Sequence, residues 1–141
     1  MSFSLSIALA LATALGGSPA QLASLQQPMP QSQSVKEYVE TYFADTPVMI
    51  EIASCESHFT QFGKDGQVVK NPNSTAVGVF QIMSSIHASF ADKKLGVDIY
   101  TIQGNLAYAK YLYDTTGTAP WNASKSCWGK SEAAKTLALA K

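Results

Sequence analysis

The chain of 141 residues has no arginine, and its ten lysines are balanced by ten acidic residues, so its formal net charge is zero. Proteins that bind nucleic acid or phosphate normally present a basic surface or the planar fork of arginine. The nucleotide-binding patterns GxGxxG and GxxxxGK[ST] are also absent from the sequence. We therefore expect neither a nucleic acid nor a nucleotide as ligand.

Histidine and cysteine are scarce. The two histidines, His58 and His87, lie far apart in the sequence, as do Cys55 and Cys127. This spacing fits none of the usual arrangements of metal ligands. We expect a protein that works without a metal ion or another cofactor.

The N-terminal segment has an uncharged apolar run from Phe3 to Leu15, followed by small residues up to Ala20. The run is too short to cross a bilayer, which takes ~20 apolar residues. The pattern is typical of a secretory signal peptide over residues 1–20, cleaved after Ala20 or Ala23. No basic residue precedes the run, and a buried or interfacial helix is the alternative. No cysteine lies near the cleavage region, which excludes a lipoprotein anchor. We expect an exported protein that is extracellular, periplasmic or associated with the cell wall.

The rest of the chain divides by composition. Residues 21–33 are uncharged and rich in Gln, Pro and Ser, which is typical of a flexible linker. The whole chain is 46% hydrophobic and 14% charged, as in ordinary globular domains, and it is long enough for one domain. We expect that domain at residues 34–128, followed by a C-terminal tail at 129–141.

An even pair of cysteines in an exported chain is typical of a disulfide. A bridge from Cys55 to Cys127 is therefore our hypothesis, and two reduced thiols in the core are the alternative. Neither cysteine has a histidine placed in the sequence to activate it as a nucleophile.

The coarse secondary structure is mainly helical. Capping residues and apolar spacing predict four helices. These begin at Ser34, Thr46, Ser84 or Ser85, and Thr101, and end near Phe43, His58, Leu95 and Thr116. The turn sequence at 64–67 predicts a hairpin that leads into a short strand at Val68–Val69, and the apolar run Val77–Met83 is expected as a further strand. The expected fold class is α+β.

Glu56 is the first candidate for chemistry. It closes an apolar run that begins at Pro47, so its carboxyl is expected at the edge of a core. Loss of water raises the pKa of a carboxyl, and a carboxyl that stays protonated near neutral pH serves as a general acid. A solvated glutamate at a helix end is the alternative.

Further candidate site residues lie within or beside apolar segments of the sequence. Gln81 interrupts the run Val77–Met83, and burying it unpaired would cost ~1–3 kcal/mol. It therefore either bonds nearby backbone or faces a cleft. Gly78 allows another backbone or a ligand to approach closely. Asn105 and Tyr108 share one face of the fourth helix, where Asn105 either lines a groove or caps a neighbouring loop.

Three ordered motifs carry a resemblance to a known family. These are Glu56-Ser57-x-Phe59, Gly78-Val79-Phe80-Gln81-Ile82-Met83 and Asn105-Leu106-Ala107-Tyr108. Their order and spacing resemble the soluble lytic transglycosylase domain over roughly Thr46 to Trp128. The cysteine before the glutamate and the segment Trp121…Cys127-Trp128 also resemble the resuscitation-promoting factors, a related lysozyme-like group.

The resemblance implies a lysozyme-like fold with a small β-hairpin beside the active-site cleft. It implies cleavage of the β-1,4 bond between N-acetylmuramic acid and N-acetylglucosamine in peptidoglycan glycan strands. Glu56 would be the only catalytic acid and base, and the products would carry 1,6-anhydromuramic ends. The same resemblance assigns substrate-binding roles to further residues. Ser57 would support the acid, Gln81 would bond the sugars, Gly78 would let the glycan approach, and Asn105 and Tyr108 would line the cleft.

Three alternatives remain open. If Asp65 reached the cleft and positioned a water, the protein would be a lysozyme-type hydrolase of the same bond, although Asp-Gly is common in hairpin turns. The chain could also be a glycan-binding module without turnover, or an unrelated exported helical adaptor. In each case we expect a monomer.

Overall fold

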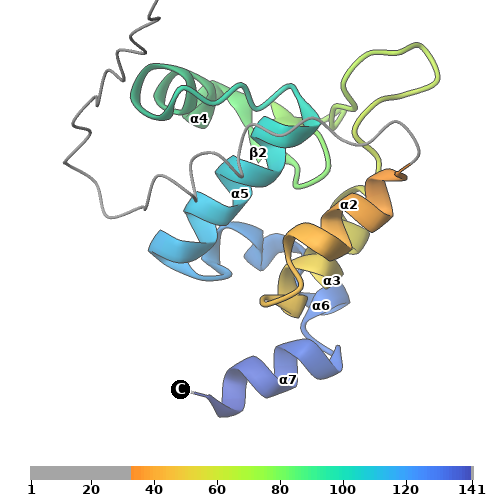
Figure 1. The fold of residues 1–141 in the computed structure, drawn as a ribbon, viewed down its shortest axis with the longest axis vertical. Helices are drawn as coiled ribbons and strands as arrows, with labels where there is room; N and C mark the ends of the chain where they lie inside the picture. Colours follow the sequence, from red (N-terminus) through yellow and green to blue (C-terminus); the bar gives the residue numbers. More distant parts are fainter. Residues whose placement is uncertain (1–32, 141) are drawn as a thin grey trace, which may run out of the picture.

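The computed structural model describes residues 33–140. The expected signal peptide (1–20) and almost all of the expected linker (21–33) lie outside the described residues. The described part is a mainly helical α+β arrangement with one two-stranded antiparallel sheet (Figure 1). Its order is α2 Val35–Tyr42, α3 Pro47–Ser57, β1 Ala76–Val77, β2 Ile82–Met83, α4 Ser84–Phe90, η1 Ala91–Leu95, α5 Ile102–Thr116, η2 Ala119–Ser124, α6 Lys125–Trp128 and α7 Glu132–Leu139.

Helices α2 and α3 begin where local signals predict. The Ser34 hydroxyl accepts a hydrogen bond from the Glu37 amide, and the Glu37 carboxylate accepts one from the Ser34 amide, which confirms the capping box. Pro47 occupies the first position of α3, where its missing N–H removes no helical bond. Thr46 precedes it, but its side chain makes no capping bond. Helix α3 ends at Ser57, and His58 takes the left-handed conformation that terminates it.

The apolar run Val77–Met83 is not a single strand, as the sequence led us to expect. Its ends form β1 and β2, which pair antiparallel with Val77 opposite Ile82, so the run folds back on itself through residues 78–81. The turn needs left-handed backbone at Gly78, with φ of 73°, and at Gln81, with φ of 48°. The hairpin expected around residues 64–69 is reduced to one isolated bridge between Phe62 and Val68. The sheet therefore lies further along the chain than predicted.

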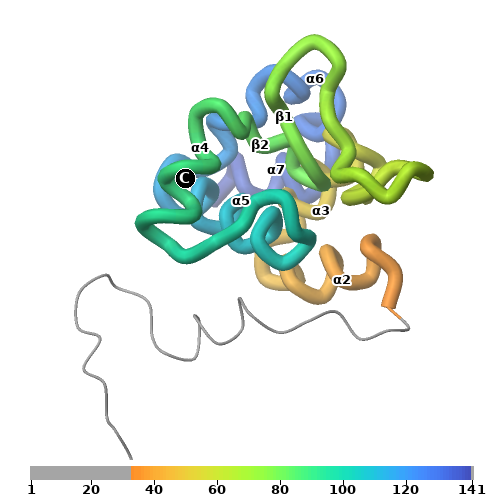
Figure 2. Tube along the Cα trace, turned by 90° about the horizontal axis from the view of Figure 1, so that it is seen from above, coloured from red at the N-terminus to blue at the C-terminus, as the bar shows by residue number. Residues whose placement is uncertain are grey.

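Helix α5 is the central element. In the two perpendicular views it lies between α4 on one side and α2 and α3 on the other (Figures 1 and 2). The Thr101 hydroxyl accepts from the Gly104 amide and starts α5 at the predicted residue. Leu106 and Ala109 are completely buried on its inner face.

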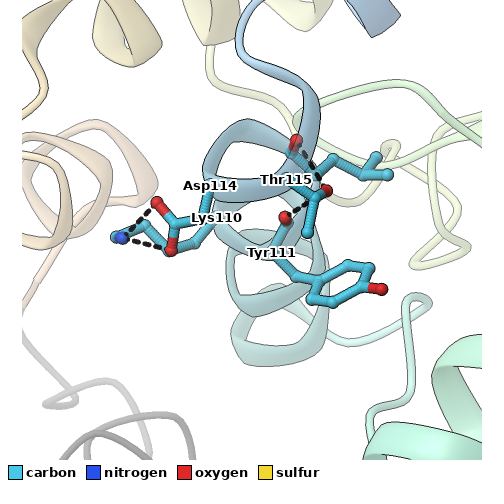
Figure 3. Close-up of polar contacts among 5 residues, drawn as sticks. Lys110, Tyr111, Asp114 and Thr115 are labelled. Atoms are coloured by element: carbon cyan, nitrogen blue, oxygen red, sulfur yellow. Dashed lines mark hydrogen bonds and ion pairs between the residues drawn. The ribbon is translucent and has the colours of Figure 1, made fainter. Parts of the chain in front are cut away.

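The solvent side of α5 is polar. The Lys110 ammonium lies 2.6 Å from a carboxylate oxygen of Asp114, one helical turn further on (Figure 3). Close to the C-terminal end, the Thr115 hydroxyl donates to the Tyr111 carbonyl oxygen over 2.8 Å (Figure 3). Exposed polar contacts of this kind add little stability, so α5 is held mainly by its buried face.

Aromatic side chains join the helices at the centre. The ring of Phe80 packs edge-on against Phe43 at 5.2 Å between centroids and against Trp121 at 6.0 Å. Phe80 and Phe43 are completely buried, and Trp121 is 3% exposed. The β1–β2 turn, α2 and η2 thus meet in one core.

The C-terminal segment returns to α3. A disulfide joins Cys55 in α3 to Cys127 in α6, with 6.1 Å between the Cα atoms, so the predicted bridge is confirmed and the reduced-thiol alternative is wrong. Most of the expected tail forms helix α7, which packs against α3 with Ala133, Ala134 and Leu137 partly buried on the core (Figure 1). Among residues 33–140 we find no helix with the length and apolar character that a membrane span requires.

Candidate functional site

Glu56 lies in the last turn of α3 and is half-buried. Its carboxylate oxygen Oε1 accepts a hydrogen bond of 2.5 Å from the hydroxyl of Ser124, at the end of η2. Burial raises the pKa of Glu56, and the hydrogen bond from Ser124 opposes part of that rise. The carboxyl therefore holds its proton to higher pH than an exposed glutamate does.

The backbone beside Glu56 takes an uncommon conformation. His58 and Phe59 have φ of 53° and 59°, and the third non-glycine residue with positive φ in the described chain is Gln81, in the β1–β2 turn. Residues with side chains adopt this region at a cost, and such positions cluster at functional sites. Here they shape the end of α3 and the neighbouring turn.

Ser57 connects these two segments. Its hydroxyl donates to the Val79 carbonyl oxygen over 2.8 Å and accepts from the Thr60 amide over 3.1 Å. The first bond holds the β1–β2 turn against the end of α3, and the second shapes the chain that leaves the helix. Ser57 thus fixes the surroundings of Glu56 through the backbone.

Gln81 lies in the same turn and is partly exposed. Its side-chain amide donates to the Gly78 carbonyl oxygen over 2.9 Å, which closes the turn from within. The sequence left open whether Gln81 bonds nearby backbone or faces a cleft, and the structure shows the bond to backbone, with the side chain partly exposed.

Asn105 supports the turn from inside the molecule. It is completely buried, its oxygen accepts from the Phe80 amide at 2.9 Å, and its nitrogen donates to the carbonyl oxygens of Val77 and Ile99. A Cβ atom at Gly78 would collide with the Asn105 amide. The close approach that Gly78 permits is therefore to Asn105. Of the two positions expected for Asn105, the structure shows the one that caps a neighbouring loop.

Tyr108 is also buried, at 2% exposure, and its hydroxyl lies 3.0 Å from Nδ1 of His87 in α4. Its ring stacks at a tilt on Tyr111. These contacts join α4 to α5 and leave little of Tyr108 at the surface. Of the residues named from the sequence, Glu56, Ser57 and Gln81 are partly accessible, whereas Asn105 and Tyr108 lie in the interior.

Two residues of the site were missed in the sequence. Ser124 is one. A signal for it was present, because Cys127 was expected to bridge to Cys55, the neighbour of Glu56, and Ser124 lies three residues before Cys127. Gln61 is the other: it is 1% exposed, accepts from the Val79 amide at 3.0 Å and donates to the Tyr100 carbonyl oxygen at 3.0 Å. No pattern in the sequence distinguishes Gln61 from an ordinary loop glutamine.

Ser124 is placed by two tryptophans. The Trp121 indole N–H donates to the Phe80 carbonyl oxygen at 2.9 Å, which ties η2 to the β1–β2 turn. The Trp128 indole N–H donates to the Trp121 carbonyl oxygen, also at 2.9 Å. The Cys55–Cys127 bridge then joins α6 to the residue next to Glu56. The hydroxyl of Ser124 is thus positioned by the tryptophan bonds and the carboxyl of Glu56 by its place next to the disulfide.

A depression of about 450 Å³ lies elsewhere, between the end of α4, η1 and the segment that ends at Tyr100. It is lined by none of the residues that surround Glu56. Within residues 33–140 no group of three or more His, Cys, Asp or Glu side chains is arranged to hold a metal ion. Comparison of the chain with protein-family models, with curated proteins and with solved structures finds no match.

Proposed function

We propose that the chain is a peptidoglycan-cleaving enzyme of the lytic transglycosylase type, in which Glu56 is the single acid and base. The observation that carries the proposal is the half-buried Glu56 carboxyl, whose pKa is raised by burial and whose neighbour Ser57 is bonded to the β1–β2 turn. A carboxyl of this kind can be protonated at the start of a reaction and ionised afterwards.

The reaction needs two proton transfers at Glu56. The protonated carboxyl gives its proton to the glycosidic oxygen, and the bond from that oxygen to C1 of the muramic acid breaks. The C6 hydroxyl of the same sugar attacks C1, and the Glu56 carboxylate takes the hydroxyl proton. Glu56 ends protonated, and the product is a 1,6-anhydro sugar with no water consumed.

Most glycosidases use a second carboxylate to position water or to attack C1. Two other acidic residues are near Glu56 in the sequence. Asp65 is exposed, and its carboxylate accepts from the Gln67 amide at 3.0 Å, which makes it part of its own turn. Glu51 is exposed on α3, five residues before Glu56 and so on a different side of the helix. These placements favour the one-acid reaction over the hydrolytic alternative.

The disulfide supports export. Disulfides form and persist in oxidising compartments such as the periplasm and the extracellular space, where peptidoglycan is accessible. A substrate in the cell wall is consistent with that location.

The test is release of soluble fragments from purified cell-wall sacculi, with Glu51→Gln as the matched control for Glu56→Gln. We expect Glu56→Gln to lower the rate by about 10²–10⁴-fold, as loss of a general acid does, and Glu51→Gln to keep the wild-type rate. Mass analysis should find 1,6-anhydromuramic ends. Equal release by wild type and Glu56→Gln would refute the proposal. Reducing ends would indicate the hydrolase, and binding to sacculi without release would indicate a glycan-binding module.

A further inference from the structure

The Ser124 hydroxyl has two acceptors within reach and one proton. Its oxygen lies 2.5 Å from Oε1 of Glu56 and 3.1 Å from the Trp121 carbonyl oxygen. A serine hydroxyl donates one hydrogen bond and accepts others. Only one of the two bonds can therefore use the Ser124 proton at a given moment.

The protonation state of Glu56 decides between them. An ionised Glu56 can only accept, so it draws the Ser124 proton toward itself, and such a charge-assisted bond is the stronger one. A protonated Glu56 has its own O–H and can donate to the Ser124 oxygen. The Ser124 proton is then free to point to the Trp121 carbonyl.

We propose that Ser124 is a positioning residue that holds Glu56 in one place in both of its protonation states by reversing the direction of their hydrogen bond. The proposal rests on the acid–base function proposed for Glu56 and adds a residue to it. A single residue that serves first as acid and then as base must stay aligned with two different atoms of the substrate. A partner that bonds both forms keeps it there.

The second acceptor, the Trp121 carbonyl oxygen, is fixed in a position where it can accept the hydrogen bond from Ser124. The Trp121 side chain is buried and its indole is fixed to the Phe80 carbonyl oxygen. The Trp121 carbonyl oxygen also accepts from the Trp128 indole, which fixes its position next to the Ser124 hydroxyl. The Trp121 carbonyl is thus held in place whichever way the Ser124 proton points.

Charged neighbours do not replace Ser124 in this role. Helices α2, η2, α6 and α7 pack against α3, and the β1–β2 turn, whose residues 78–81 carry no charge, is bonded to its end. The charged side chains on these helices belong to exposed or half-exposed residues. They are Lys36, Glu37 and Glu40 on α2, Lys125 on α6, and Glu132 and Lys135 on α7. Lys36 pairs with Glu40, Lys135 pairs with Glu132, and Glu37 caps α2. The causes of the pKa shift of Glu56 are burial and Ser124.

The experiment is a pH titration followed by carbon-13 NMR at the Glu56 carboxyl and at the Trp121 carbonyl. In wild type we expect both signals to change with one midpoint, because protonation of Glu56 redirects the Ser124 proton to Trp121. In Ser124→Ala the Trp121 signal should stop titrating, and the midpoint of Glu56 should rise because a bond to its ionised form is lost. Ser124→Thr keeps the hydroxyl and should behave as wild type. Ser126→Ala, an exposed serine on α6, is the matched control.

The titration decides the proposal without turnover, so its failure is distinct from failure of the proposed function. A Trp121 signal that ignores the titration of Glu56 in the folded wild type would overturn the role of Ser124, even if sacculi are cleaved. With turnover, Ser124→Ala should lower kcat by about 10-fold at unchanged KM, the scale of one lost hydrogen bond to a charged group, and shift the pH profile in the direction of the Glu56 midpoint. Equal losses in the Ala and Thr variants would also overturn it.

Discussion

Two polar clusters lie near the β1–β2 turn and differ in how accessible their side chains are to solvent. The first consists of Gln61 and Asn105, which are buried and whose side chains form hydrogen bonds with backbone groups. The second is the pair of Glu56 and Ser124, which is partly accessible and contains a titratable group.

This difference distinguishes polar side chains that hold the fold together from polar side chains that can gain or lose a proton. Within the described chain no buried side-chain nitrogen or oxygen lacks a hydrogen-bond partner. In the Gln61–Asn105 cluster these partners are fixed amides and carbonyls, so nothing in it changes with pH. In the Glu56–Ser124 pair one partner is a carboxyl that gains and loses a proton with pH, and the bond to Ser124 is proposed to reverse its direction when it does. The first cluster holds the turn in place, and the second contains the group that can gain and lose a proton.

The largest effect should come from breaking the first cluster. Asn105→Ala leaves the Phe80 amide and the carbonyl oxygens of Val77 and Ile99 without their partner. We expect a loss of roughly 3–5 kcal/mol in the free energy of unfolding, since each buried polar group left unpaired costs ~1–3 kcal/mol. Urea unfolding measures it. Asn122→Ala, at an exposed asparagine in η2, is the control and should change stability by less than ~0.5 kcal/mol. Equal small effects would show that the Asn105 bonds contribute little.

Removing the disulfide beside the second cluster should lower the free energy of unfolding by a similar amount. The disulfide closes a loop with a sequence separation of 72 residues, so Cys55→Ser with Cys127→Ser should lower the free energy of unfolding by ~4 kcal/mol in the chain-entropy model. Wild type in reductant should unfold at the same urea concentration as the variant. An unchanged midpoint in both would mean that packing alone holds α6 to α3.

A smaller effect tests the charge in the second cluster. Because the folded-state pKa of Glu56 is raised above 4.5, its contribution to stability is fully present below pH 4.5 and is lost as pH rises through the raised value. Glu56→Gln should therefore unfold at higher urea concentration than wild type at pH 7. The difference should vanish below pH 4.5. Glu51→Gln, at an exposed position of α3, is the matched control for the substitution. Equal midpoints of wild type and Glu56→Gln at pH 7 would contradict the burial of the Glu56 carboxyl.

The smallest effect is expected at Asp65, outside both clusters. Asp65→Asn keeps the oxygen that accepts from the Gln67 amide, so stability should change by less than ~0.5 kcal/mol. Cleavage of sacculi should stay within about twofold of wild type, since one-acid chemistry needs no second carboxylate. A large loss of activity in a folded variant would place Asp65 at the reaction and favour the hydrolase.

Local signals in the sequence predicted the helices well. Ser34 with Glu37 marks the start of α2, and Thr101 and Gly117 mark the two ends of α5, because capping depends on bonds between residues that are three or four positions apart. Gly96 ends the helical stretch formed by α4 and η1 for the same reason. These features are set by neighbours along the chain, so they can be read without the fold.

The β1–β2 turn could not be predicted in this way. Its left-handed Gln81 and its close packing against Asn105 depend on bonds that cross from the turn to α5 and to Gln61. The run Val77–Met83 has the apolar pattern of a strand, and only these long-range contacts make it reverse direction. Asn105 lies in the interior because of these contacts, and Tyr108 packs against His87 and Tyr111, whereas the family resemblance had placed both residues at a cleft.

The sequence by itself determined where α2, α3, α4 and α5 start, allowed only one pair of cysteines to be bridged, and pointed to one carboxyl as the best candidate for acid–base chemistry. These features rest on local capping, on a single possible pair of cysteines and on an apolar run that ends in a glutamate. Only the tertiary structure decided which hydroxyl meets that carboxyl. Ser124 is 68 positions from Glu56, and the packing of Trp121 and the disulfide bring the two within 2.5 Å. A contact over such a separation depends on how the whole core packs, which no local pattern encodes.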